Sequence, residues 1–144
     1  MEKSTVFGAC IENYKGIEYQ YIFPKHGAYA LMLRNGIDGL PQVAEVPPVV
    51  NVCFEKAGGR PAQVELAQVK RIAKEKKAEK KNPGWAYDPY INIDGIRYNP
   101  AYIVDCLEIL GGNATFCHDP DSYLNGALME NENGRAILLP CRKP

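Results

Sequence analysis

The chain has 144 residues, a formal net charge of zero and an ordinary mixture of apolar and charged side chains, which fits one globular domain over residues 1–144. Its first ten residues lack the basic start and apolar run of a signal peptide, and no window approaches the ~18 apolar residues that a membrane span needs. We therefore expect a cytoplasmic protein with no membrane partner. Five scattered cysteines without a Cys-x-x-Cys pair favour neither a disulfide framework nor a zinc site.

The charge is distributed unevenly, although it sums to zero. Residues 60–83 hold eight basic and three acidic side chains, a balance of +5, so the rest of the chain carries −5. A positive segment on an acidic body is typical of a protein that meets a polyanion.

Strands are expected through the first third of the chain. Apolar and polar residues alternate over residues 5–23 around the turn signal Asn13–Gly16, which predicts a hairpin. A short strand is predicted at 28–33, and another at 49–55 between two prolines and two glycines. Together these segments predict a β-meander.

A helix is predicted from Pro61 to about Lys81, because proline suits a first helical turn and apolar residues then recur at helical spacing. The segment Asn82-Pro-Gly84 ends it. Beyond Leu66 the apolar stripe thins to alanine, while lysines recur along one flank at positions 70, 74, 77 and 81. The helix is expected to show a basic face.

The next segment combines a hairpin with a strongly specified helix. Residues 85–98 are rich in aromatic and β-branched residues around the turn Asp94-Gly95. Asn99 and Pro100 suit the N-cap and first position of a helix over 100–110, and Gly111-Gly112 ends it. Its core-facing stripe would be Tyr102, Ile103, Cys106, Leu107 and Leu110.

Three short strands are expected after this helix, at 114–117, 123–129 and 136–139, separated by turns rich in Asp, Asn and Gly. The whole pattern predicts an α+β protein with an antiparallel sheet and two main helices.

Two sequence stretches resemble the C-terminal domain of the bacterial sliding clamp, the beta subunit of DNA polymerase III. They are Tyr98-Asn-Pro-Ala-Tyr-Ile-Val-Asp-Cys-Leu107 and Leu138-Leu-Pro-Cys-Arg142, and the similarity extends over about residues 90–142. The resemblance implies a DNA-clamp-like fold whose helices lie side by side on one sheet face, toward duplex DNA. It also implies a surface for peptide motifs of replication proteins, formed in part by Leu139, Pro140, Cys141 and Arg142. A clamp chain carries three such domains, so a ring would require a homo-oligomer.

The sequence thus supports a non-enzymatic, DNA-associated accessory protein with a processivity or replication-linked role and no cofactor. Phosphate contacts need only regularly spaced positive charge, and the candidate residues are Lys70, Arg71, Lys74, Lys77 and Lys81. The same lysines would equally fit a solvated helix face. Trp85 and the tyrosines after it could stack on single-stranded nucleic acid, or could belong to the core of a sheet.

Two alternative functions stay open. One is a clamp-like protein-interaction or regulatory module, of the kind a mobile element could encode, that does not bind DNA. The other is a small enzyme that uses Cys117 and His118, although neighbours on a strand point to opposite faces. The sequence contains no phosphate-binding glycine motif and no calcium-binding loop.

Overall fold

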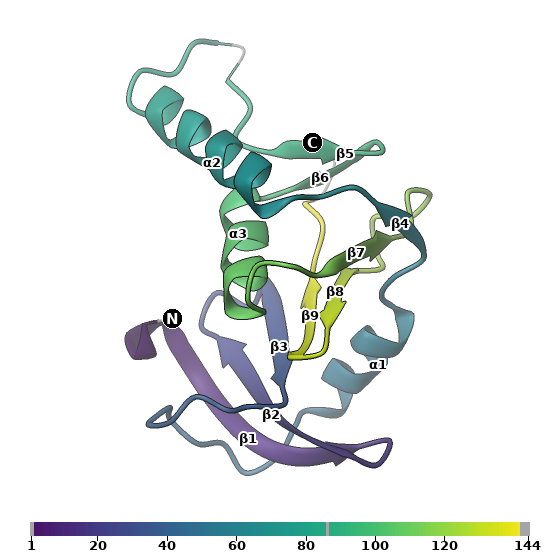
Figure 1. The fold of residues 1–144 in the computed structure, drawn as a ribbon. Helices are drawn as coiled ribbons and strands as arrows, with labels where there is room; N and C mark the ends of the chain where they lie inside the picture. Colours follow the sequence, from purple (N-terminus) through teal and green to yellow (C-terminus); the bar gives the residue numbers. More distant parts are fainter. Residues whose placement is uncertain (1, 86, 142–144) are drawn as a thin grey trace.

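The computed structural model describes residues 2–85 and 87–141 and shows strands and helices in an α+β arrangement (Figure 1). After a 3-10 turn at Lys3–Thr5, the elements are β1 (Val6–Tyr14), β2 (Ile17–Pro24), β3 (Tyr29–Leu33), α1 (Pro48–Lys56), β4 (Arg60–Ala62), α2 (Leu66–Lys80), β5 (Ile91–Ile93), β6 (Ile96–Tyr98), α3 (Pro100–Ile109), β7 (Thr115–His118), β8 (Ala127–Asn131) and β9 (Gly134–Leu138). Within the described residues, seven strands form one antiparallel sheet in the order β1-β2-β3-β9-β8-β7-β4, and β5-β6 is a separate hairpin. The predicted α+β class with an antiparallel sheet is confirmed, and α1 is a helix in addition to the two predicted ones.

Both predicted tight hairpins are confirmed. Lys15 and Gly16 between β1 and β2 have φ angles of 51° and 86°, and Asp94 and Gly95 between β5 and β6 have 51° and 89°. Positive φ at both central residues is the geometry that lets a two-residue turn follow the twist of its strands. The third predicted strand is also confirmed as β3.

The strand predicted at 49–55 is wrong, because this segment is helix α1. Pro48 occupies the first turn, where a missing N–H is tolerated, and Val50 N–H donates to Pro47 O at 3.0 Å. The helix places Phe54 in a buried cluster with Tyr21 and Met32. Tertiary packing therefore overrides the strand propensity of a segment rich in valine.

The start predicted for the lysine-rich helix is also wrong. Residues 60–62 form β4, with Pro61 opposite Cys117 of β7, and α2 begins at Leu66. Proline is tolerated on an edge strand, where its missing N–H removes no ladder bond, and β4 is the last strand of the sheet. The predicted end of this helix, near Lys81, agrees with the structure.

The prediction for α3 is confirmed at both ends. The side chain of Asn99 accepts a hydrogen bond from Ala101 N–H at 2.9 Å, and Gly111 and Gly112 follow the helix with positive φ. Ile103 and Leu107 are buried in the main core cluster. The last three strands are confirmed as well, except that β8 begins at Ala127 rather than near residue 123.

The sheet buries side chains on both faces. Leu31 and Leu33 of β3 pack in the cluster that contains α3, whereas Met32 between them packs in the cluster that contains α1. The two predicted helices are neighbours, but the expectation that both lie on one sheet face holds for α3 alone. α3 contacts β3 and β9, whereas α2 packs mainly against α3. Figure 1 shows the C-terminal end of α2 and the following loop standing away from the sheet.

Candidate nucleic-acid interface

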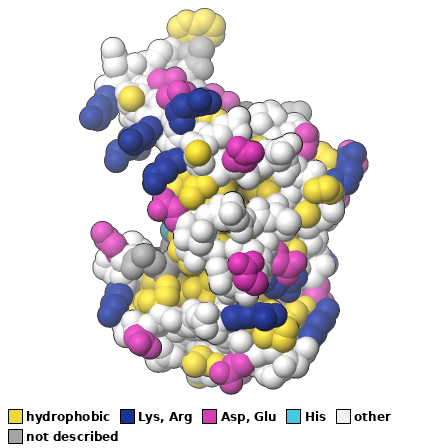
Figure 2. Space-filling model, viewed as in Figure 1, with side chains coloured by type: hydrophobic (Ala, Val, Ile, Leu, Met, Phe, Trp, Pro, Cys, Tyr) yellow, Lys and Arg dark blue, Asp and Glu magenta, His cyan; other side chains and the backbone are white. Residues whose placement is uncertain are grey.

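Helix α2 is attached to the molecule along a short apolar stripe. Among its described residues only Val69 is buried, and Leu66 and Ala73 pack partly buried against the same core. Its sequence is built from strong helix formers, so it can stay helical with most of its surface in water. Four of its lysines, at positions 70, 74, 77 and 80, are therefore exposed and Lys76 is half-buried, and Figure 2 shows Lys and Arg side chains gathered over α2.

An open cleft of about 490 Å³ lies between α2, the first turns of α3 and residues 87–89. We call it the basic cleft. Its floor is apolar and includes Ala73, Tyr87, Pro100 and Val104. Five lysines line it, at positions 70, 74, 76, 77 and 80, and Asp105 is the one acidic side chain among the described residues that do so. This arrangement can hold a polyanion by charge and also offers an apolar surface.

The structure brings together three of the five residues predicted to contact DNA. Lys70, Lys74 and Lys77 line the basic cleft, whereas Arg71 and Lys81 are exposed but do not line it. Sequence reasoning missed Lys76 and Lys80. The small side chain of Ala73 is the signal that could have found them. Lys76, Lys77 and Lys80, which lie three, four and seven positions beyond it, share its helix face.

Hydrogen bonds fix the wall of the basic cleft opposite α2. The Tyr87 hydroxyl donates to Lys76 O at 3.2 Å, which attaches the returning chain to α2. Asp88 then accepts from Arg97 at 3.0 Å, and the Arg97 guanidinium lies over the Tyr90 ring at 4.6 Å. A hydrogen bond from Tyr90 N–H, with the Arg97 guanidinium beside it, lowers the pKa of Asp88. The cleft is thus shaped by contacts that do not involve its lysines' ammonium groups.

The acidic residues of α3 limit how far the positive surface extends. Glu108 pairs with Lys70 at 3.8 Å, with both side chains about half exposed. Asp105 accepts a hydrogen bond from the Tyr29 hydroxyl at 3.3 Å, and burial raises its pKa. The positive side chains that line the basic cleft therefore all come from α2.

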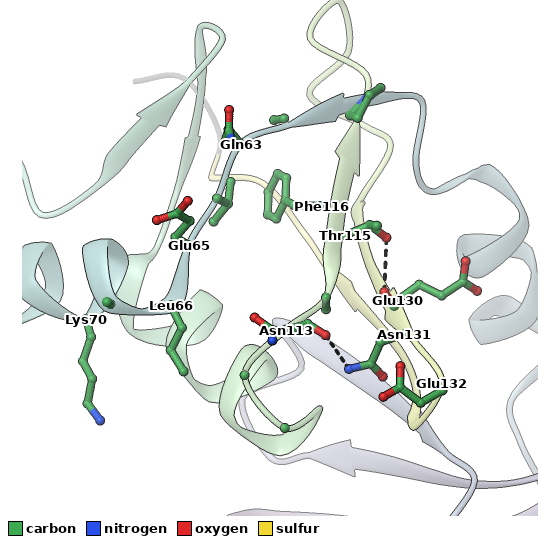
Figure 3. A pocket seen from close by; sticks show the side chains of 17 residues that line it. Gln63, Glu65, Leu66, Lys70, Asn113, Thr115, Phe116, Glu130, Asn131 and Glu132 are labelled. Carbon is green, nitrogen blue, oxygen red and sulfur yellow. Dashed lines mark hydrogen bonds between the residues drawn. The ribbon is translucent and has the colours of Figure 1, made fainter.

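A larger open cleft, of about 1100 Å³, lies on the other side of the start of α2 (Figure 3). Segment 61–67, the turn after α3 and the turn between β8 and β9 surround it. Phe116 points into it, and Glu65 and Glu130 point away from its interior (Figure 3). Its charged lining is Glu65, Lys70, Glu130 and Glu132, so this cleft does not suit a phosphate. Among the described residues no cluster fits a metal ion.

The predicted partner-binding residues at the C-terminal end are only partly brought together. Leu139 is 44% exposed and lines an apolar groove of about 190 Å³ with Phe23, Val49 and Cys53. We call it the tail groove. Pro140 and Cys141 are half-buried and do not line this groove, and Arg142 lies outside the described residues. Cys141 N–H donates to Arg97 O at 2.7 Å, so this end of the chain is attached to β6.

His118 is fully buried and has both ring nitrogens occupied. Nδ1 lies 2.8 Å from the Tyr98 hydroxyl, and Nε2 lies 2.9 Å from Asp94 Oδ2. The Cys117 side chain is on the opposite face of β7, as alternation along a strand requires. This geometry leaves His118 without a nitrogen to activate the Cys117 thiol, so the two residues do not form a nucleophile–base pair.

Comparison with protein-family models, curated proteins and solved structures finds no match for this chain. None of the described helices is both long enough and apolar enough to cross a membrane.

Proposed function

We propose that this protein is a non-enzymatic, DNA-associated accessory protein that holds the phosphate backbone in the basic cleft. The observation that carries the proposal is the convergence of five lysines on one cleft with a single carboxylate. The sequence resemblance to one sliding-clamp domain points to the same partner, duplex DNA, and to a replication-linked role. Encircling DNA would then require several copies of the chain.

Binding through lysine–phosphate contacts should make the affinity for DNA depend on salt concentration. If each of the five lysines neutralises one phosphate, the slope of log K against log salt is about −4.5, equivalent to about a 500-fold loss of affinity between about 50 and 200 mM salt. Because these contacts read no base edges, affinity should not depend on sequence. Light scattering with and without DNA would measure whether copies assemble.

The test compares two variants with the same change in net charge. In the cleft variant Lys74, Lys76, Lys77 and Lys80 are replaced by glutamine, and in the control variant Lys3, Lys15, Lys25 and Lys56 are replaced by glutamine. All eight side chains are on or near the surface, and glutamine preserves helix propensity.

Duplex binding is followed by the anisotropy of a labelled oligonucleotide across a salt series. The cleft variant should lose about 3.6 units of slope, whereas the control should keep its slope. Absence of binding at low salt, or equal losses in both variants, would remove the proposal. Circular dichroism checks that both variants keep the helices.

A second candidate function is protein interaction through the tail groove. Leu139 and Val49, exposed to 44% and 62%, stand beside an apolar groove, an arrangement that suits the aliphatic or aromatic anchor of a peptide. Binding of labelled pentapeptides with leucine and phenylalanine anchors should weaken in Leu139→Ser. Leu124→Ser is the matched control, since Leu124 is exposed in a different loop. Equal binding by both variants would argue against this use of the groove.

A further inference from the structure

Trp85 is the single tryptophan of the chain, and its side chain is completely exposed, with a relative exposure of 101%. Tryptophan is largely buried on average, because its ring carries a large apolar surface. Here that whole ring surface is in water, just beyond the C-terminal end of α2. Neither the main core nor the cluster beneath α1 uses this side chain.

The turn that carries Trp85 is attached to the lysine-rich helix. Tyr87 N–H donates to Gly84 O at 3.1 Å, and the Tyr87 hydroxyl bonds the backbone of Lys76. Trp85 follows Lys80, the last lysine of the basic cleft, by five residues, so their Cα atoms lie at most about 18 Å apart. The indole ring therefore stands at one end of the row of lysines, within reach of the same bound strand.

We propose that Trp85 stacks on an unpaired base, so that the DNA preferred by the basic cleft contains a single-stranded segment. This inference rests on the proposed function and specifies its substrate. Lysines contact the phosphates of paired and unpaired strands alike, whereas the bases of a duplex are already stacked and offer no face to an aromatic ring. The lysines supply affinity, and Trp85 supplies the preference for unpaired bases.

Charge and polarity at this end of α2 favour a nucleic acid over a membrane surface. A helix that binds in a membrane interface needs an apolar face turned outward. Leu66 and Val69 of α2 face the core instead, Ile72 is half-buried, and residues 80–84 are Lys-Lys-Asn-Pro-Gly. One ring among such residues suits stacking between bases better than insertion into lipid.

The single tryptophan makes its own fluorescence a direct readout of stacking. The wild-type protein is titrated at low salt with an oligothymidine of about 20 nucleotides and with a duplex of similar length. Emission should be quenched by the single strand and not by the duplex. The single strand should also bind about tenfold more tightly than the duplex.

Substitutions then separate stacking from charge. Trp85→Leu should weaken binding of a labelled single strand about tenfold and leave duplex binding unchanged, while Trp85→Phe should recover part of the loss. Leu124→Ala is the control for removing an exposed apolar side chain elsewhere.

Three outcomes would overturn the inference, and they can be told apart. Equal affinity for both DNAs with unchanged emission removes the role of Trp85 and leaves the proposed function standing. Absence of binding to either DNA removes both. A blue-shifted emission with phosphatidylserine vesicles, together with none of the DNA effects, identifies a membrane-facing residue instead.

Discussion

The helices α2 and α3 pack against each other, but they are held in the molecule in different ways. α3 buries five of its ten residues, and its first turn is closed by the side chain of Asn99. α2 is longer, with fifteen residues, yet it buries only Val69 among its described residues, and its N-cap residue Glu65 makes no side-chain capping bond. The core therefore determines the sequence of α3, whereas most positions of α2 remain available for charge.

This difference also predicts how each helix opens. A segment with few buried contacts can unfold locally at a lower free energy than the core. α2 should exchange its amide hydrogens faster than α3, and binding of DNA to its lysines should slow that exchange. The helix proposed to bind the ligand is thus the one whose stability a ligand could change most.

The largest effect is expected from truncating the core of α3. Leu107 is 1% exposed, so Leu107→Ala should destabilise the fold by about 2–5 kcal/mol through lost burial and a residual cavity. Val69→Ala on α2, also at a position 1% exposed, removes two methyl groups and should lose about 1–2 kcal/mol. Urea unfolding measures both, and a larger loss for Val69→Ala would contradict the difference between the helices.

An intermediate effect is expected at the two helix starts. Asn99→Ala removes the acceptor for Ala101 N–H and should lower the free energy of unfolding by about 1 kcal/mol. Glu65→Ala removes no capping bond and should change it by less than about 0.5 kcal/mol. Thermal unfolding of both variants provides the comparison, and similar losses would show that Glu65 also stabilises its helix.

The parts of the fold that could be predicted from the sequence depend on local chemistry. Lys15-Gly16 and Asp94-Gly95 determine their turns, and Asn99-Pro100 determines the start of α3, without help from distant residues. α1 and β4 could not be predicted, because distant partners select them. Phe54 packs under the sheet, and Pro61 lies opposite Cys117.

The candidate site likewise combines features that local sequence predicts with features that depend on distant partners. Lysine spacing predicted one basic helix flank, and Lys70, Lys74 and Lys77 of that flank line the basic cleft, whereas Lys81 does not. The position of Asp105 in the cleft depends on how α3 packs against α2, which helical periodicity cannot give. The exposure of Trp85 is equally a tertiary property, since an aromatic residue in that run fits a sheet core as well.

The smallest effect concerns pH and the acidic residue on the α3 side of the basic cleft. Burial raises the pKa of Asp105 in the folded protein, with the Tyr29 hydroxyl and His26 acting in the opposite direction. The folded state therefore binds this proton more tightly than the unfolded state, and the resulting stability is lost as pH rises from about 4 through the folded pKa. Asp105→Asn keeps an acceptor for Tyr29 but carries no charge, so it should gain stability relative to the wild type across that window.

Asp88→Asn should change stability relative to the wild type in the opposite direction as pH rises, because the pKa of Asp88 is lowered in the folded protein and its contribution to stability is lost as pH falls. Urea unfolding at a series of pH values measures both differences. If the free energy of unfolding of both variants followed the same pH dependence, the opposite pKa shifts of Asp105 and Asp88 would be contradicted.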